Sequence, residues 1–132
     1  MPTIQKFEDL KVWQKARELT QKIYPLTFIE PICSDFRFRD QIRASAGSVI
    51  ESIAEGYERS SRLEFVNFLS IAKGSAGEVR SQLYRAIDNN YIDDKVVKDL
   101  IGMYEKLSKD IAGFIKYLNI SQLKGQKFNG RA

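Results

Sequence analysis

The sequence has no histidine and a single cysteine, Cys33. Without histidine, zinc sites that contain it, Ser-His-Asp or Cys-His catalysis and di-iron sites built on Glu-x-x-His are all excluded. One cysteine can form no internal disulfide, and it supplies too few thiolates for a cysteine-rich metal site. There is also no glycine-rich phosphate loop. We therefore expect no enzymatic activity, no cofactor, no metal and no small-molecule substrate.

Helix breakers and long apolar runs are scarce as well. The three prolines, Pro2, Pro25 and Pro31, all precede residue 32. Because proline is the strongest helix breaker, the rest of the chain favours an all-α fold. No run of about 18 apolar residues could span a bilayer, and the start, MPTIQKFEDLK, lacks the apolar segment of a signal peptide. We therefore expect a cytoplasmic protein that does not act at a membrane.

What remains is the composition of an ordinary globular protein. Hydrophobic residues make up 43% of the 132 residues and charged residues 29%, which predicts one folded domain with a high ratio of surface to volume. Oligomerisation would help to stabilise such a small domain. The net charge of +4 permits a nucleic-acid partner without requiring one.

Apolar residues recur at alternating spacings of three and four in four segments, which predicts helices over about 9–27, 35–55, 61–88 and 93–118. We call the apolar residues with this spacing the seam of each helix. In chain order, the four seams are Val12, Ala16, Leu19, Ile23 and Leu26; Ile42, Ala46, Val49 and Ile53; Phe65, Leu69, Ala72, Ala76, Val79, Leu83 and Ala86; Val97, Leu100, Tyr104, Leu107, Ile111, Phe114 and Leu118. Short connections favour antiparallel neighbours, so residues 1–118 are predicted to form an up-down-up-down four-helix bundle. Residues 119–132 lose the pattern and are expected to be a flexible, basic tail.

Local signals support these boundaries. Gly56 is expected to stop the second helix as a C-terminal glycine, whereas Gly74 and Gly77, inside the third, predict the close approach of a neighbouring helix. Candidate N-cap residues precede every helix: Asp9, Ser34 or Asp35, Ser61 within a capping box that ends at Glu64, and Asp93 or Asp94.

Basic residues recur on single faces of the first and last helices. Two interpretations stay open, a solvated helix face and a surface that contacts phosphates. The candidate nucleic-acid-binding residues are Lys11, Lys15 and Lys22 on the first helix, Lys95, Lys109 and Lys116 on the last, and Lys124, Lys127 and Arg131 in the tail. Paired acids can act as acid and base, but Glu55 and Glu78 are expected to form ion pairs with Arg43 or Arg80 instead.

Several apolar residues lie outside the seams. They are too many for the surface of a monomer, so we expect an oligomer larger than a dimer or, alternatively, a scaffold that binds a protein partner and no nucleic acid. The candidate interface residues are Leu10, Trp13, Tyr24, Phe68 and Ile71.

Three segments together resemble a known family: FEDLKVWQKA, QIRASAGSVIESIAEG and ERSSRLEFVNFLSIAKGSAGEV. They are similar to the small four-helix-bundle proteins encoded in intervening sequences of bacterial large-subunit ribosomal RNA genes, and to the related accessory proteins of diversity-generating retroelements. The chain departs from the usual Asn-Ile-Ala-Glu-Gly motif at Ser52, and Ala76-Gly77 replaces bulkier residues. The resemblance implies a homopentameric ring without enzymatic activity, with a basic surface that in the retroelement relatives engages nucleic acid and a reverse transcriptase.

Overall fold

The computed structural model describes residues 3–129, and the side chains up to residue 121. All regular structure in this part of the chain is helical. Within it, no helix combines the length and apolar character needed to cross a bilayer. The elements are η1 (Phe7–Asp9), α1 (Lys11–Leu26), η2 (Ile32–Ser34), α2 (Phe36–Glu58), α3 (Arg62–Asp88) and α4 (Asp94–Asn129), where η marks a short 3-10 helix.

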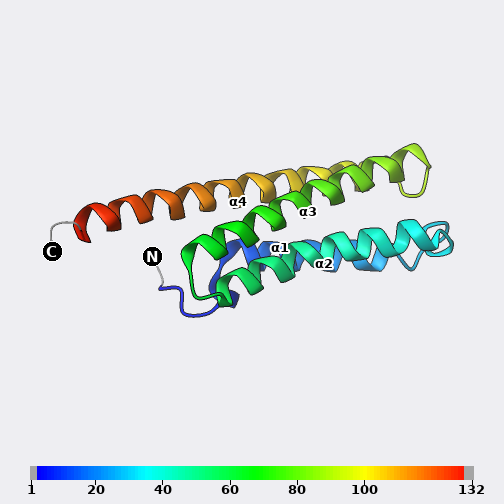
Figure 1. Cartoon of the computed structure of the whole chain (residues 1–132). Helices are drawn as coiled ribbons and strands as arrows, with labels where there is room; N and C mark the ends of the chain where they lie inside the picture. The colour runs from blue at the N-terminus through cyan, green and yellow to red at the C-terminus, as the bar shows by residue number, and fades with distance from the viewer. Residues whose placement is uncertain (1–2, 130–132) are drawn as a thin grey trace.

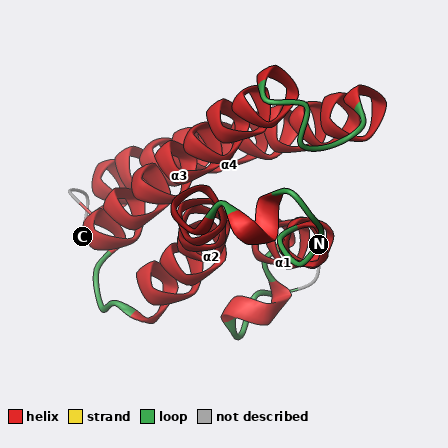
Figure 2. Cartoon of the chain, turned by 90° about the vertical axis from the view of Figure 1, so that its right-hand side faces the viewer, coloured by secondary structure: helices red, strands yellow, loops and turns green. Residues whose placement is uncertain are grey.

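The four long helices form an antiparallel up-down-up-down bundle, which confirms the predicted fold (Figure 1). α3 packs most extensively against α2 and α4, whereas α1 packs mainly against α2 and only lightly against α4. Seen from the end of the bundle, the α3–α4 pair runs obliquely across the α1–α2 pair (Figure 2). Because α4 packs mainly against α3, the side of α4 that points away from the other helices faces solvent along the length of the bundle.

The predicted seams form the core. Leu19, Ile53, Leu69, Leu83 and Leu107 have no accessible surface, and burying each such side chain contributes about 1.5–3 kcal/mol. Seam residues at the helix ends, such as Leu26, Phe65 and Phe114, are only partly buried and pack against the edge of this core. The alternation of three and four therefore identified the buried face of every helix.

The predicted N-cap residues are confirmed for α2, α3 and α4, and the prediction for α1 is wrong. The backbone N–H of Phe38 donates to Asp35 at 3.2 Å, that of Glu64 to Ser61 at 3.1 Å and that of Lys95 to Asp93 at 2.9 Å. Asp9 is not the cap of α1, because it lies in η1 and its carboxylate accepts from the N–H of Gln5 instead.

Gly56 does not stop the second helix. α2 continues to Glu58, and Gly56 is buried within it. A β-carbon at this position would lie 2.5 Å from the β-carbon of Phe68 on α3. Gly56 is therefore a point of close approach between α2 and α3.

The close approach expected at Gly74 and Gly77 is wrong. No atom lies within 4 Å of where a β-carbon would stand at either position. Packing within the chain therefore does not explain why α3 carries these two glycines.

α4 is longer than the sequence pattern predicts. It continues past Leu118 to Asn129, so residues 119–129 are helical rather than irregular (Figure 1). Loss of the apolar period removes packing partners but not the backbone hydrogen bonds, and no proline interrupts the segment. The helix therefore projects beyond the other three.

Candidate nucleic-acid interface

Five lysines line one side of α4. We call Lys95, Lys98, Lys106, Lys109 and Lys116 the α4 lysine face, and all five are exposed. With 3.6 residues per turn, their positions fall within about a quarter of the helix circumference. The backbone geometry of a single helix is therefore enough to bring these positive charges onto one surface.

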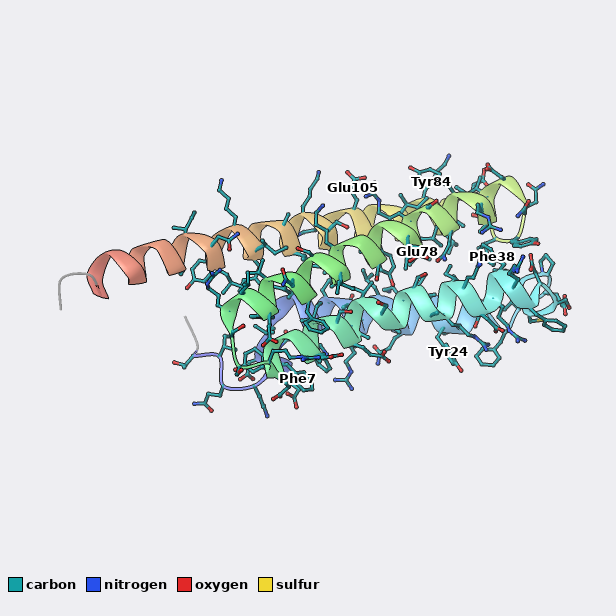
Figure 3. The ribbon with its side chains drawn as sticks, in the orientation of Figure 1. Phe7, Tyr24, Phe38, Glu78, Tyr84 and Glu105 are labelled. Atoms are coloured by element: carbon teal, nitrogen blue, oxygen red, sulfur yellow. The ribbon has the colours of Figure 1, made fainter. Side chains whose placement is uncertain are left out.

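Carboxylates flank this surface and pair with two of the lysines. Lys106 Nζ lies 3.2 Å from Asp110, and Lys109 Nζ lies 3.5 Å from Glu105, both within α4. Glu105 projects from the outer edge of α4, away from α1 and α2 (Figure 3). Such exposed pairs contribute about 0–1 kcal/mol and exchange readily for other anions.

The remaining lysines of the face are free of such pairing. Lys95, Lys98 and Lys116 make no ion pair with any described residue. The α4 lysine face therefore offers three cations directly and two more by exchange.

The predicted α1 lysines make a weaker surface. Lys11 and Lys22 are exposed, whereas Lys15 is half-buried and pairs with Glu18 at 3.2 Å. The side chains of Lys124 and Lys127, and all of Arg131, lie outside the described residues.

Sequence reasoning missed two members of the α4 lysine face. Lys95, Lys109 and Lys116 were found because their spacings are multiples of seven. Lys98 and Lys106 do not fit that period, but each lies eleven residues from another lysine of the face. An eleven-residue period was the signal that could have found them.

The predicted oligomer-interface residues do not form one surface. Leu10 is 4% exposed and belongs to the core, so its assignment to an interface is wrong. The reason is that Leu10, between η1 and α1, belongs to the same core cluster against which Phe7 of η1 packs. Trp13 and Phe68 are half-buried: Trp13 packs edge-on against Phe7 at 5.2 Å, and Phe68 contacts Gly56.

Two of these residues remain exposed. Ile71 on α3 is 51% exposed and Tyr24 on α1 is 49% exposed. Tyr24 projects from the side of the α1–α2 pair that is opposite α3 and α4 (Figure 3).

An arginine–aromatic cluster holds the connection between α1 and α2. The guanidinium of Arg43 lies 4.8 Å from the ring centre of Tyr24 and 4.7 Å from that of Phe28. Its Nε also donates to Thr27 Oγ1 at 2.7 Å. Sequence reasoning expected Arg43 or Arg80 to form ion pairs with Glu55 and Glu78, so it missed this cluster. The aromatic residues around Pro25 were the signal that could have found it.

Glu55, one of the carboxylates considered for catalysis, and Arg80 form ion pairs other than the predicted ones. Glu55 pairs with Arg59 at 2.6 Å, and Arg80 pairs with Glu105 at 3.8 Å. The expected pairs of Glu55 and Glu78 with Arg43 or Arg80 are thus not formed. In the described residues, no three acidic or cysteine side chains come together in a way that could hold a metal ion.

A hydrogen bond ties the start of α2 to the α3–α4 turn. The hydroxyl of Tyr91 donates to Asp35 Oδ2 at 2.6 Å, and Phe38 packs edge-on against Tyr91 at 5.4 Å. Figure 3 shows Phe38 between α2 and the α3–α4 end. The bond from Tyr91, together with the bond from the Phe38 N–H, holds the pKa of Asp35 below its ordinary value.

The surface hollows are open. One, of about 380 Å³, has an almost wholly apolar lining that includes Thr20, Tyr24, Pro25 and Ile50. A small-molecule site usually combines a concave apolar wall with a few convergent polar groups, whereas the lining residues Arg17, Thr20 and Gln21 present almost no polar surface to this hollow. The electrostatic surface of α4 is therefore the stronger candidate site.

Comparisons with known proteins agree with this architecture. The family model of the 23S rRNA-intervening sequence proteins matches residues 8–113. A solved structure from Bacteroides thetaiotaomicron, described as a protein with unknown function from the S23 ribosomal protein family, is similar with a TM-score of 0.73 and 27% sequence identity. The similarity covers 80% of this chain and 98% of that one. No curated protein matches the chain.

Proposed function

Because the chain belongs to the 23S rRNA-intervening sequence protein family, we propose that it is a non-enzymatic accessory protein that binds nucleic acid. The observation that carries the proposal is the α4 lysine face, with three of its five lysines free of ion pairs among the described residues. Lysines on a straight exposed helix can contact phosphates without reading sequence.

Oligomerisation is part of this proposal. Five lysines on one protomer neutralise few phosphates, whereas a ring of protomers repeats the same face and raises the total affinity. The homopentamer implied by the family resemblance supplies such a ring. The exposed Ile71 and Tyr24 supply apolar surface for contacts between protomers. Light scattering is expected to give a mass above that of a dimer, and a stable monomer at working concentration would contradict it.

The resemblance to retroelement accessory proteins supports a reverse transcriptase as a further partner. Copurification with a reverse transcriptase encoded beside the gene tests this partner directly. A gene that lies instead within a ribosomal RNA operon, with no reverse transcriptase nearby, favours the ribosomal RNA context.

Fluorescence anisotropy with a labelled, structured RNA at low salt tests the proposed function. The double variant Lys98→Gln/Lys116→Gln removes two unpaired lysines and is expected to weaken binding about tenfold, since each phosphate contact contributes to affinity. The control is Lys6→Gln/Arg37→Gln, which removes the same charge from exposed positions on the N-terminal segment and on α2. Absence of binding by the unmodified protein, or equal losses in both variants, would overturn the proposal.

A second candidate function is a protein scaffold. The observation in its favour is the exposure of aromatic and aliphatic side chains at the α1–α2 end, where Phe28, Ile29 and Phe36 are 60%, 56% and 64% exposed. Exposed apolar patches are typical of protein-binding surfaces. A partner that is retained in a pull-down after nuclease treatment, together with no RNA binding, would favour the scaffold.

A further inference from the structure

Two consecutive segments of α4 repeat one pattern. Residues 95–105 read KVVKDLIGMYE and residues 106–116 read KLSKDIAGFIK. Lysine, lysine, aspartate and glycine recur at the first, fourth, fifth and eighth positions, and apolar residues recur at the second, sixth, seventh, ninth and tenth, whereas Val97 at the third position is matched by Ser108. The repeat is therefore eleven residues long and includes the surface as well as the core side of the helix.

An eleven-residue repeat places equivalent residues on a nearly straight line. Eleven residues make about three turns of α-helix and advance about 16 Å along the axis. Lys95 and Lys106 therefore lie on one line, and Lys98 and Lys109 on a neighbouring one. All four side chains are exposed.

Gly102 and Gly113 lie between these lysines on the same side of α4, and both are exposed. No atom lies within 4 Å of where their β-carbons would stand. Glycine weakens a helix interior, and packing within the chain does not require it at these positions, in contrast to Gly56. The two glycines leave the α4 backbone open at the places where a ligand held by the lysines would lie.

An exposed aromatic residue continues the line. Tyr117 follows Lys106 by eleven residues and is 59% exposed. Its ring stacks on Phe114, with centroids 6.4 Å apart and an interplanar angle of 27°. This contact orients the ring and leaves it available for a further stacked partner.

We propose that a single-stranded nucleic acid lies along α4, with phosphates at the two lysine pairs, its backbone against Gly102 and Gly113 and a base stacked on Tyr117. A cationic track combined with stacking aromatics is the usual way in which proteins bind single strands. A straight track of about 33 Å suits an extended strand, because a strand in a duplex winds away from a rod and keeps its bases inside. This inference rests on the proposed function and specifies its ligand.

Glycine variants separate binding from folding. Gly102→Gln/Gly113→Gln is expected to raise the thermal midpoint, because glutamine is the better helix former, yet to weaken binding of a labelled oligouridine about tenfold. The control, Gly74→Gln/Gly77→Gln on α3, also has open space and is expected to raise the midpoint with unchanged affinity. Light scattering checks that no variant changes the oligomeric mass.

Tyrosine variants test the stacking step. Tyr117→Ala is expected to weaken oligouridine binding at least about fivefold, given the usual effect of removing a stacked aromatic. Tyr84→Ala removes an aromatic residue that is 53% exposed on α3 and serves as the matched control.

Different binding results would overturn the proposed function and the single-strand inference. No binding of any RNA by the unmodified protein overturns the proposed function. Lysine-dependent binding that prefers a duplex of equal length, or that is unchanged in both the α4 glycine and the Tyr117 variants, overturns only the single-strand inference.

Discussion

At the scale of single residues, Tyr104 is the most unusual member of the core. It is the largest fully buried side chain, and its hydroxyl has no hydrogen-bond partner among the described residues. Burial raises the pKa of this hydroxyl above the ordinary tyrosine value. The Oγ of Ser108, one turn further along α4, also lacks a partner in this part of the chain. The seam position fixes Tyr104 in the core, so its hydroxyl is buried with it.

Tyr104→Phe is therefore expected to stabilise the protein by about 1 kcal/mol, because an unsatisfied buried polar group costs about 1–3 kcal/mol. The urea unfolding midpoint measures the change. Tyr84→Phe, at an exposed position, should leave the midpoint unaltered. A marked loss of stability in Tyr104→Phe would show that the hydroxyl is hydrogen-bonded in solution.

At the scale of helices, the contact between α2 and α3 depends on Gly56. Gly56→Ala would place a β-carbon 2.5 Å from that of Phe68 and 3.1 Å from the Phe65 ring. Because the Phe68 β-carbon is fixed to the backbone, the two helices must move apart. Overpacking of this kind costs about 1–3 kcal/mol.

Denaturant unfolding of Gly56→Ala should thus show a loss of about 2 kcal/mol. Gly74→Ala has open space around it and should instead gain up to about 1 kcal/mol from helix propensity. Equal effects of the two substitutions would mean that α2 and α3 are not in close contact at Gly56.

The junction between α2 and the α3–α4 turn gives a pH dependence. The pKa of Asp35 is lowered mainly by the hydrogen bond from Tyr91 and then by the bond from the Phe38 N–H. A carboxyl group with a lowered pKa stabilises the folded state above its ordinary pKa and loses that contribution as the pH falls through the folded-state value.

Asp35→Asn should accordingly be less stable than the unmodified protein at pH 7, and the difference should shrink as the pH falls below the ordinary aspartate value of 3.8. Thermal midpoints measured between pH 7 and about pH 2.5 test this expectation. A difference that stays constant over this range would mean that Asp35 is not ionised in the folded state, or not bonded to Tyr91.

The helices also show what the sequence can and cannot predict. The buried faces followed from apolar spacing, because apolar residues such as Leu69 and Val79 are removed from water only when the helix face that carries them packs against other helices. Gly56 was misassigned because glycine suits both a helix end and a close helix contact, and only the position of Phe68 distinguishes them. Lys98 and Lys106 were missed because a seven-residue period describes the core but not the outer side of α4.

At the scale of the whole molecule, charge is distributed unevenly. The net charge is only +4, yet α4 gathers five lysines on one exposed side over much of its length. The carboxylates that pair with two of them are exposed and weakly bound. The affinity of such a surface for a polyanion should depend on salt far more than on sequence.

The most direct test is the salt dependence of single-stranded RNA binding by the unmodified protein and by a variant with all five lysines of the α4 lysine face changed to glutamine. For single strands, the slope of log affinity against log salt changes by about −0.7 for each neutralised phosphate. We predict a steep negative slope for the unmodified protein and a slope shallower by about 3.5 for the variant, with five contacts removed. Binding with the same slope in both proteins, or binding that salt does not weaken, would contradict the account.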